Sequence, residues 1–162
     1  MVSVQKSKFG KGLFATVDIP KNTIVTRVTG RRMNFAETIA LEEKESHTLQ
    51  TGPDQYILCE PPFLYSNHSC DPNCGLTPNL EMITLEPIKK GQELFWDYST
   101  SMLERHWTMR CSCGSANCRG IITDFDLLPQ ELQTSYIHRN IVLPFILEKM
   151  REPVPTYWQT YR

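Results

Sequence analysis

The stretch that decides the fold is Asn67-His68-Ser69-Cys70-Asp71-Pro72-Asn73-Cys74, and a second cysteine block follows it about forty residues later. That block, Cys111-Ser112-Cys113 together with Cys118, has the spacing C-x-C-x4-C and supplies three thiolates. A closed structural zinc site needs four ligands. Either Cys70 or Cys74 of the earlier turn can supply the fourth. The pattern therefore predicts a zinc site that is completed when the later segment folds over the earlier turn.

The composition is that of one globular domain. The chain has 162 residues, of which 40% are hydrophobic and 22% are charged, so it can bury a core without disulfides. The net charge is −1, and no run of Lys or Arg is longer than two residues. Binding to nucleic acid needs a concentration of positive charge. We therefore expect no direct binding to nucleic acid.

The N-terminus and the cysteines bear on the cellular compartment. The first residues, Met1-Val2-Ser3-Val4-Gln5-Lys6, contain no apolar signal region. No apolar stretch approaches the length of a membrane span. We expect no membrane association and an intracellular location, in the cytoplasm or the nucleus. In such a reducing compartment the six cysteines favour metal binding over disulfides.

Turn residues and β-prone runs predict many short strands and little helix until the end of the chain. Asn34 followed by Glu37 is a capping-box pattern, which predicts a helix start. Pro129 suits the first turn of a helix, and Pro144 is expected to divide the helical pattern around it. The expected elements are strands at 23–28, 55–59, 81–85 and 93–96, a helix at 35–44, and helical structure over 129–150.

Taken singly, the other candidate residues have ordinary explanations. The pair Gly10-x-Gly12 is more typical of a turn than of a dinucleotide loop, because the third glycine is absent. His68 alone would be a core histidine, although Asn67 beside it makes a polar turn that could reach a ligand. Tyr98 could fill space at a strand end. Cys59, in an apolar strand, is expected to be a small buried hydrophobe.

Taken in order, these motifs resemble the SET-domain protein lysine methyltransferases, and the last of them resembles the post-SET zinc tail of that family. The resemblance covers roughly residues 3–123, and the NHSCxPN turn is its most specific part. The motifs that carry it are Gly10-Lys11-Gly12-Leu13-Phe14, the turn from Asn67 to Asn73, Gly91-Gln92-Glu93-Leu94-Phe95-Trp96-Asp97-Tyr98, and the C-x-C-x4-C block.

The resemblance implies a fold and a division of the chain. The fold is mainly β with short helices, built of several small sheets with a pseudoknot. A post-SET zinc segment and a C-terminal helix follow it. The implied segments are a catalytic SET domain at 1–105, the zinc-binding segment at 106–123, and a mostly helical extension at 124–162.

The resemblance also implies the activity and the residues of the site. Family members transfer a methyl group from S-adenosylmethionine to a lysine through a narrow channel. The family's zinc site selects Cys70 over Cys74, and a structural Zn²⁺ is therefore expected besides the methyl donor. The matching positions are Tyr98 as the catalytic residue, Lys11, Gly12, Leu13, Asn67 and His68 at the cofactor, Tyr56 and Trp96 in the substrate channel, and Cys70, Cys111, Cys113 and Cys118 on zinc.

The expected chemistry needs a neutral amine, and a free lysine has a pKa near ~10.4. Burial in an apolar channel beside a cationic sulfonium lowers that pKa, so no strong general base is required. Trp96 stands where the family carries phenylalanine or tyrosine, and Val28 stands where it often has tyrosine. The segment Leu64-Tyr65-Ser66 replaces the usual residues before the NHSC turn. These departures lie around the substrate channel.

The expected partner is a protein or peptide that carries a lysine; a histone is one such protein, although the sequence does not indicate it. Two alternatives remain. One is a catalytically idle SET-fold module that binds a peptide or the cofactor. The other is a methyltransferase, or other cofactor-dependent enzyme, that acts on a small-molecule amine.

Overall fold

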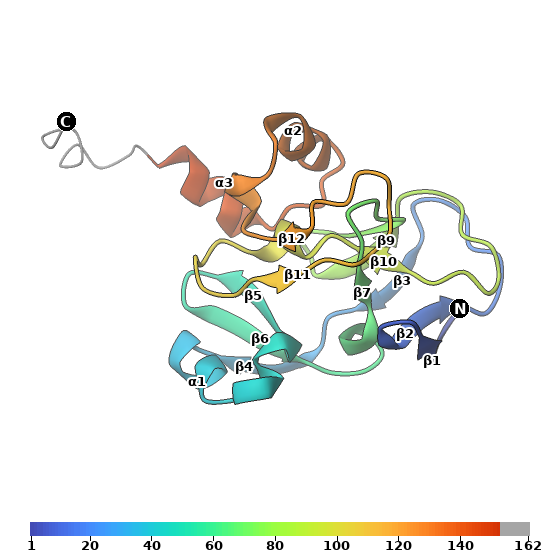
Figure 1. The fold of residues 1–162 in the computed structure, drawn as a ribbon, viewed down its shortest axis with the longest axis horizontal. Coiled ribbons are helices and arrows are strands. Elements are labelled where there is room, and N and C mark those ends of the chain that lie inside the picture. The colour runs from blue at the N-terminus through green and yellow to red at the C-terminus, as the bar shows by residue number, and fades with distance from the viewer. Residues whose placement is uncertain (153–162) are drawn as a thin grey trace, which may run out of the picture.

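The computed structural model describes residues 1–152. Within them short strands dominate, grouped in five small sheets, and the helices are few and short (Figure 1). The fold is therefore the mainly β arrangement that the sequence predicts. The strands are β1 (Val2–Ser7), β2 (Gly10–Ala15), β3 (Ile24–Arg27), β4 (Gly30–Met33), β5 (Thr48–Gly52), β6 (Gln55–Cys59), β7 (Asn67–His68), β8 (Cys74–Leu76), β9 (Glu81–Thr84), β10 (Phe95–Trp96), β11 (Met109–Arg110) and β12 (Ile121–Ile122).

The sheets pair segments that are both near and far in sequence. Two antiparallel sheets have three strands each, in the orders β4-β6-β5 and β3-β9-β8. The hairpin β1-β2 and the pair β11-β12 are also antiparallel. The strands β7 and β10 pair in parallel.

This parallel pair brings the NHSC turn beside the segment that leads to Tyr98. Asn67 faces Phe95, and His68 faces Trp96. The N–H of Ser69 extends the pairing by donating to the carbonyl of Trp96 at 3.1 Å. Two motifs that lie far apart in the sequence are thus held at a fixed register.

The strand expected at 93–96 is shorter than predicted, and Asn73 gives the reason. The strand β10 covers only Phe95 and Trp96. The Asn73 amide donates to the Glu93 carbonyl at 2.8 Å and accepts from the Phe95 N–H at 2.8 Å. A side chain therefore takes the hydrogen bonds that a neighbouring strand would otherwise make. The strands predicted at 23–28, 55–59 and 81–85 are confirmed as β3, β6 and β9, the first and last slightly shorter than expected.

The helix expected at 35–44 begins as predicted but ends early. Asn34 and Glu37 form the reciprocal capping box at the start of α1 (Phe35–Ile39). The helix cannot continue because Glu42 has a φ of 53°, in the left-handed region. A 3₁₀ helix, η1 (Glu42–His47), follows instead. The prediction of one helix over ten residues is therefore wrong.

The C-terminal pattern forms two helices that pack on the β core. The helix α2 spans Gln130–His138 and the helix α3 spans Pro144–Arg151, so Pro144 divides the run as predicted. Pro129 caps α2 rather than entering its first turn. The last part of the expected extension, residues 153–162, lies outside the described residues. No helix among residues 1–152 is long and apolar enough to cross a membrane.

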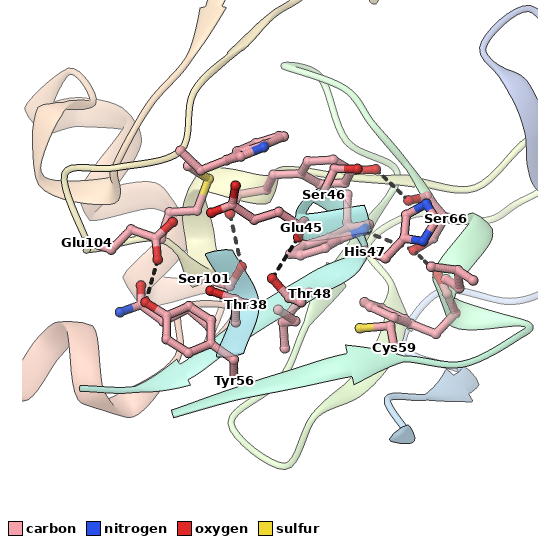
Figure 2. A pocket seen from close by; sticks show the side chains of 18 residues that line it. Thr38, Glu45, Ser46, His47, Thr48, Tyr56, Cys59, Ser66, Ser101 and Glu104 are labelled. Atoms are coloured by element: carbon pink, nitrogen blue, oxygen red, sulfur yellow. Dashed lines mark hydrogen bonds between the residues drawn. The ribbon is translucent and has the colours of Figure 1, made fainter. Parts of the chain in front are cut away.

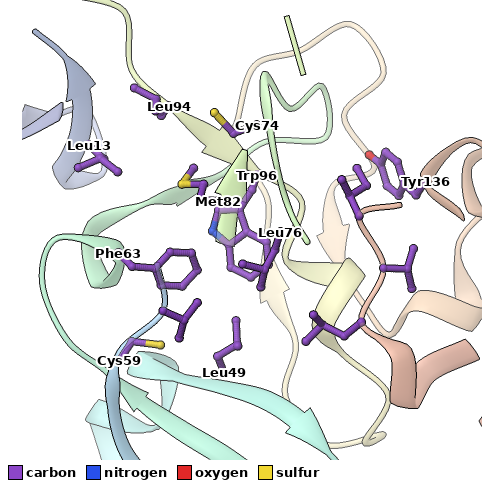
Figure 3. Close-up of a cluster of buried hydrophobic side chains, with 14 of the residues drawn as sticks. Leu13, Leu49, Cys59, Phe63, Cys74, Leu76, Met82, Leu94, Trp96 and Tyr136 are labelled. Carbon is purple, nitrogen blue, oxygen red and sulfur yellow. The ribbon is translucent and has the colours of Figure 1, made fainter. Parts of the chain in front are cut away.

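The segment between α2 and α3 belongs to the main hydrophobic core. The side chain of Ile141 is buried in that core, and a Cβ added to Gly75 would lie only 2.4 Å from it. Glycine on β8 therefore lets the C-terminal segment approach the sheet closely. Figure 3 shows the core between the strands and α2, with Leu76, Met82 and Tyr136 among its members.

Candidate active site and metal centre

Four cysteine side chains converge at one point, as the spacing predicts. The Sγ atoms of Cys70, Cys111, Cys113 and Cys118 all lie within 4.8 Å of one another. The Sγ atoms of Cys70 and Cys111 are 3.8 Å apart, which is about the separation of two thiolates on a tetrahedral zinc with Zn–S bonds of ~2.3 Å. Cys74 is fully buried in the hydrophobic core instead. The residues present therefore fit a structural Zn²⁺, with Cys70 as the ligand from the turn.

The thiols in this cluster differ in how readily they lose their protons. Burial opposes ionisation of Cys113, but hydrogen bonds, chiefly from Ser115, outweigh it and lower the pKa of Cys113 to about 5. Burial raises the pKa of Cys70 above its usual value, and burial raises that of Cys111 to about 12. A zinc ion must therefore displace the protons of Cys70 and Cys111 as it binds. In return, the ion would fasten the segment around Cys111–Cys118 to the NHSC turn.

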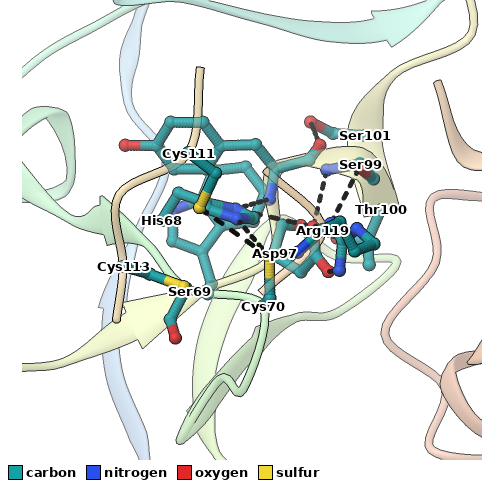
Figure 4. Close-up of polar contacts among 12 residues, drawn as sticks. His68, Ser69, Cys70, Asp97, Ser99, Thr100, Ser101, Cys111, Cys113 and Arg119 are labelled. Carbon is teal, nitrogen blue, oxygen red and sulfur yellow. Dashed lines mark hydrogen bonds and ion pairs between the residues drawn. The ribbon is translucent and has the colours of Figure 1, made fainter. Parts of the chain in front are cut away.

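The carboxylate of Asp97, the residue before Tyr98, is a second point of convergence (Figure 4). The Asp97 side chain is fully buried. Its Oδ1 accepts from Arg119 Nη2 at 2.8 Å and from the Ser99 N–H at 3.1 Å. Its Oδ2 lies 2.8 Å from Arg119 Nη1 and accepts from the Tyr136 hydroxyl at 2.9 Å. The carboxylate thus connects the cysteine segment, through Arg119, and the helix α2, through Tyr136.

His68 connects the metal cluster to the candidate catalytic tyrosine. Its Nδ1 accepts from the Tyr98 N–H at 3.2 Å, and its Nε2 lies 3.4 Å from Cys70 Sγ. Burial is the main reason that the pKa of His68 is lowered to about 4, so the ring is neutral at pH 7. Its side chain faces the interior, which leaves only its main chain to meet a cofactor.

Tyr98 lies at the junction of the turn and a recess. Its hydroxyl donates to the Ser66 carbonyl at 2.8 Å. Its ring packs edge-on against His68, with centroids 5.3 Å apart, and contacts the Trp96 ring at 4.8 Å. Burial raises the pKa of Tyr98, so the hydroxyl keeps its proton at neutral pH and can act as a donor.

The residues expected at the cofactor are joined through Asn67 and Glu93. The Asn67 amide donates to the Lys11 carbonyl at 2.9 Å and to Glu93 Oε1 at 2.7 Å. A Cβ on Gly12 would lie only 2.2 Å from Glu93 Oε1 and 2.9 Å from Ser7 Cβ, so a side chain at this position would displace the carboxylate that Asn67 and Ser7 hold. The Leu13 side chain is fully buried in the core. The Lys11 side chain is exposed.

Tyr98 also lines a recess that has several aromatic residues in its wall, and Figure 2 shows the side chains around this recess. The empty space in the recess and the open solvent at its mouth together amount to about 670 Å³. The predicted channel residues Tyr56 and Trp96 line it together with Tyr98. The Trp96 Nε1–H donates to the Ser66 hydroxyl at 3.0 Å, so the indole is fixed by its own hydrogen bond. Further lining residues that the sequence did not indicate are Glu45, His47, Phe63, Glu104 and Trp107.

Two acidic side chains, Glu45 and Glu104, line this recess, and each contacts one other side chain through an oxygen. The Tyr56 hydroxyl donates to Glu104 Oε2. Burial, and after it this hydrogen bond, raise the pKa of Tyr56. Glu45 Oε1 lies 2.8 Å from His106 Nε2. Within the described residues no Lys or Arg lines the recess, so it favours a cationic or neutral guest over an anionic one.

A comparison with known families identifies the domain that contains most of these site residues. Residues 10–99 match the SET domain, and this span contains the Gly10-x-Gly12 loop, the NHSC turn and Tyr98. The cysteine segment lies beyond the matched residues.

Several proteins named as methyltransferases are similar to this chain in sequence. The chain is 28% identical over 138 residues to "Histone-lysine N-methyltransferase, H3 lysine-36 specific" of Mycosarcoma maydis, covering 74% of this chain and 14% of that protein. It is 29% identical to "Histone-lysine N-methyltransferase trr" of Drosophila melanogaster, of which it spans 6%. It is 26% identical to "Methyltransferase flvH" of Aspergillus flavus, covering 80% of this chain and 68% of that protein. The histone-modifying relatives are thus far longer than this chain.

Solved structures share the fold. The crystal structure of an active polycomb repressive complex 2 in the basal state matches with a TM-score of 0.51 at 25% identity, over 59% of this chain and 15% of that one. A humanized mutant of the Chaetomium thermophilum complex matches with a TM-score of 0.53 at 22% identity, over 64% of this chain and 15% of that one.

Proposed function

The chain belongs to the SET-domain family, and from this premise we propose that it is an S-adenosylmethionine-dependent protein lysine N-methyltransferase. One observation carries the proposal. The side chain of Tyr98 is part of the wall of the aromatic recess, and its main chain is hydrogen-bonded to His68 of the NHSC turn. A single residue therefore lies between a place for a lysine side chain and the loop proposed to hold the methyl donor.

The recess favours a neutral amine at its inner end. Tyr56, Phe63, Trp96 and Trp107 give it large apolar surfaces, and burial among them lowers the pKa of an entering lysine. Glu45 and Glu104 act in the opposite sense, because a carboxylate favours the ammonium form. They would therefore attract the charged side chain first, and the aromatic walls would favour loss of its proton before reaction.

The role of Tyr98 is to position and stabilise rather than to take the proton. Its hydroxyl stays protonated and is already aimed at the Ser66 carbonyl. A preorganised polar group at a reacting centre acts on the charge that changes there and needs no reorganisation during reaction. When bound, S-adenosylmethionine supplies the electrophilic methyl group. We propose Lys11, Gly12, Asn67 and His68 at its site, with Leu13 contributing main chain only.

A structural Zn²⁺ is part of the proposal. Cys70, Cys111, Cys113 and Cys118 would hold it, and residues 106–123 would then act as the post-SET segment between the SET domain at 1–105 and the extension from 124. The ion would keep Arg119, next to Cys118 in sequence, at the Asp97 carboxylate. The metal would in this way support the segment that carries Tyr98 without touching the substrate.

The substrate is proposed to be a protein. The histone-lysine methyltransferases among the relatives make histones the first proteins to test, and a nuclear or cytoplasmic location is part of the same proposal. Trp96 is expected to limit the product to one or two methyl groups, because an indole occupies more of the recess than phenylalanine or tyrosine would.

The test uses the purified chain with methyl-labelled S-adenosylmethionine. Separate reactions contain core histones, a whole-cell extract or a set of free amines, and tandem mass spectrometry locates the label. We expect methyl-lysine in at least one protein, and far less with Tyr98→Phe. Cofactor binding by calorimetry without any transfer would show an idle module. Label confined to free amines would show a small-molecule enzyme.

A further inference from the structure

A second recess adjoins the one that contains Tyr98. It is lined by Phe35, Gln50, Pro53, Asp54, Tyr56, Leu103 and Glu104. Three of these residues, Gln50, Tyr56 and Glu104, also line the larger recess. The two spaces are therefore separated by a shared wall, and a chain that inserts one side chain into the first can insert a neighbouring one into the second.

The second recess combines aromatic and acidic groups. The rings of Phe35 and Tyr56 lie beside each other, with centroids 6.0 Å apart. Asp54 Oδ1 accepts from the Phe35 N–H at 2.7 Å, and Glu104 Oε2 accepts from the Tyr56 hydroxyl. Each carboxylate is thus fixed through one oxygen. Among residues 1–152 the structure records no partner for Asp54 Oδ2 or Glu104 Oε1, and no Lys or Arg pairs with either residue.

This combination suits a planar cation. A guanidinium stacks on aromatic rings, is weakly hydrated, and presents five N–H donors in one plane. Lysine offers a compact and strongly hydrated ammonium, which gains less from a ring. The remaining carboxylate oxygens of Asp54 and Glu104 can accept from such a plane, whereas an anionic side chain would be repelled by both.

We infer that this recess binds an arginine close to the target lysine, so that Asp54 and Glu104 determine which lysines are methylated. The inference rests on the proposed methyltransferase function and names the substrate class of the same site. In an extended peptide, residues two apart point the same way and are separated by about 7 Å. Adjacent recesses divided by one wall fit such a pair, and we expect the arginine within two residues of the lysine.

The test is a degenerate peptide library with one fixed central lysine and all common residues at the two positions on each side. The purified protein methylates it with labelled S-adenosylmethionine, and tandem mass spectrometry reads the sequences of the peptides methylated at the central lysine. We expect arginine to be enriched about tenfold over the mean residue at one position, the effect of one hydrogen bond to a charged group.

Two isosteric variants assign the preference to the recess. Asp54→Asn keeps an oxygen for the Phe35 N–H, and Glu104→Gln keeps one for the Tyr56 hydroxyl, while each removes a charge. We expect each to reduce the enrichment of arginine several-fold. Asp54 does not line the recess of Tyr98, so Asp54→Asn should leave methylation of arginine-free peptides unchanged, whereas Glu104→Gln alters the wall of that recess and is judged by the enrichment alone. Glu131→Gln, on the exposed face of α2, is the matched control and should leave the preference intact.

The outcomes separate the inference from the function on which it rests. A library that is methylated without enrichment of arginine would overturn the inference and leave the methyltransferase in place. Enrichment that survives in both variants, or that favours lysine over arginine, would also overturn it. No methylation of this library, of histones or of extract proteins would instead contradict the proposed function.

Discussion

The Tyr136 hydroxyl donates a hydrogen bond of 2.9 Å to Asp97 Oδ2, and both residues are buried. Asp97 immediately precedes Tyr98, whereas Tyr136 lies on α2, after the cysteine segment. The helix α2 therefore contacts the residue that directly precedes the candidate catalytic tyrosine. Arg119 approaches the same carboxylate from the cysteine segment, so the buried negative charge is balanced by a guanidinium and hydrogen-bonded by a hydroxyl, both from residues late in the chain.

Tyr136→Phe tests this link. The change keeps the ring in the core and removes one hydrogen bond to a charged acceptor, which costs roughly 1.5–3 kcal/mol. We expect the free energy of unfolding, measured by urea denaturation, to fall by about that amount. Tyr65→Phe is the control, because its hydroxyl only accepts a long contact of 3.5 Å from Lys11 Nζ. Equal stability of the two variants would show that Arg119 and the Ser99 N–H satisfy Asp97 without the Tyr136 hydroxyl.

Cys111→Ser tests the metal centre. The protein is expected to contain one zinc per chain by elemental analysis, and the variant, with three thiolates left, should lose most of it. Structural zinc contributes ~10–16 kcal/mol in small peptides at neutral pH, so the cysteine segment should become sensitive to protease while the strands that precede it remain folded. Activity should therefore fall before the β-structure seen by circular dichroism does.

Cys74→Ala is the matched control for this prediction. Cys74 follows Cys70 in the stretch that begins with the NHSC turn. It is buried in the hydrophobic core and is not part of the cluster of four thiols. The variant should lose some stability because it leaves a small cavity, yet it should keep its zinc. Loss of zinc in Cys74→Ala with retention in Cys70→Ala would reverse the assignment of the fourth ligand.

Sequence patterns predicted those features that depend on local chemistry. Residue type and spacing alone predicted the capping box of Asn34 and Glu37 and the division of the C-terminal helices at Pro144. They also predicted a cysteine cluster, but the choice of Cys70 over Cys74 came from the family resemblance. The shortened strand at Phe95 could not be predicted, because a side chain from a different motif, that of Asn73, replaces a strand partner.

The walls of the recess were only partly predictable for a similar reason. Tyr56 and Trp96 were expected from motif positions, but Trp107 and Glu104 lie in an irregular segment with no periodicity. Tyr136 and Arg119 acquire their roles only when the chain folds back onto Asp97. Long-range pairing of this kind leaves no local signal in the residues that take part in it.

Asn67→Ala tests the proposed cofactor loop. The Asn67 amide holds both the Lys11 carbonyl and Glu93, so its loss should free the Gly10-x-Gly12 loop. We expect the affinity for S-adenosylmethionine, measured by calorimetry, to fall at least about tenfold, since a hydrogen bond to a charged group is worth roughly 1.5–3 kcal/mol. Asn79→Ala, at an exposed position, should bind as the wild type does. Unchanged affinity in Asn67→Ala would make this turn purely structural.

Trp96→Phe tests the control of methylation degree. The wild type is expected to stop at one or two methyl groups, because the indole is fixed by its bond to Ser66 and its bulk forms part of the wall of the recess. The smaller ring should leave room for another methyl group, so mass spectrometry should detect a higher degree of methylation. Some stability will be lost with the buried indole. Abundant trimethyl-lysine from the wild type would show that another residue sets the limit.

Tyr98→Phe tests the residue on which the enzymatic proposal depends. The variant keeps the ring against His68 and Trp96 and removes one hydrogen bond to the Ser66 carbonyl, so stability should change by about 1 kcal/mol. The rate should fall by roughly 10²–10³, the usual effect of one preorganised polar group at a reacting centre. Cofactor affinity should change much less, because the NHSC turn is untouched. A folded variant that methylates at nearly the wild-type rate would exclude the hydroxyl from catalysis, and the aromatic recess would then have to act through desolvation alone.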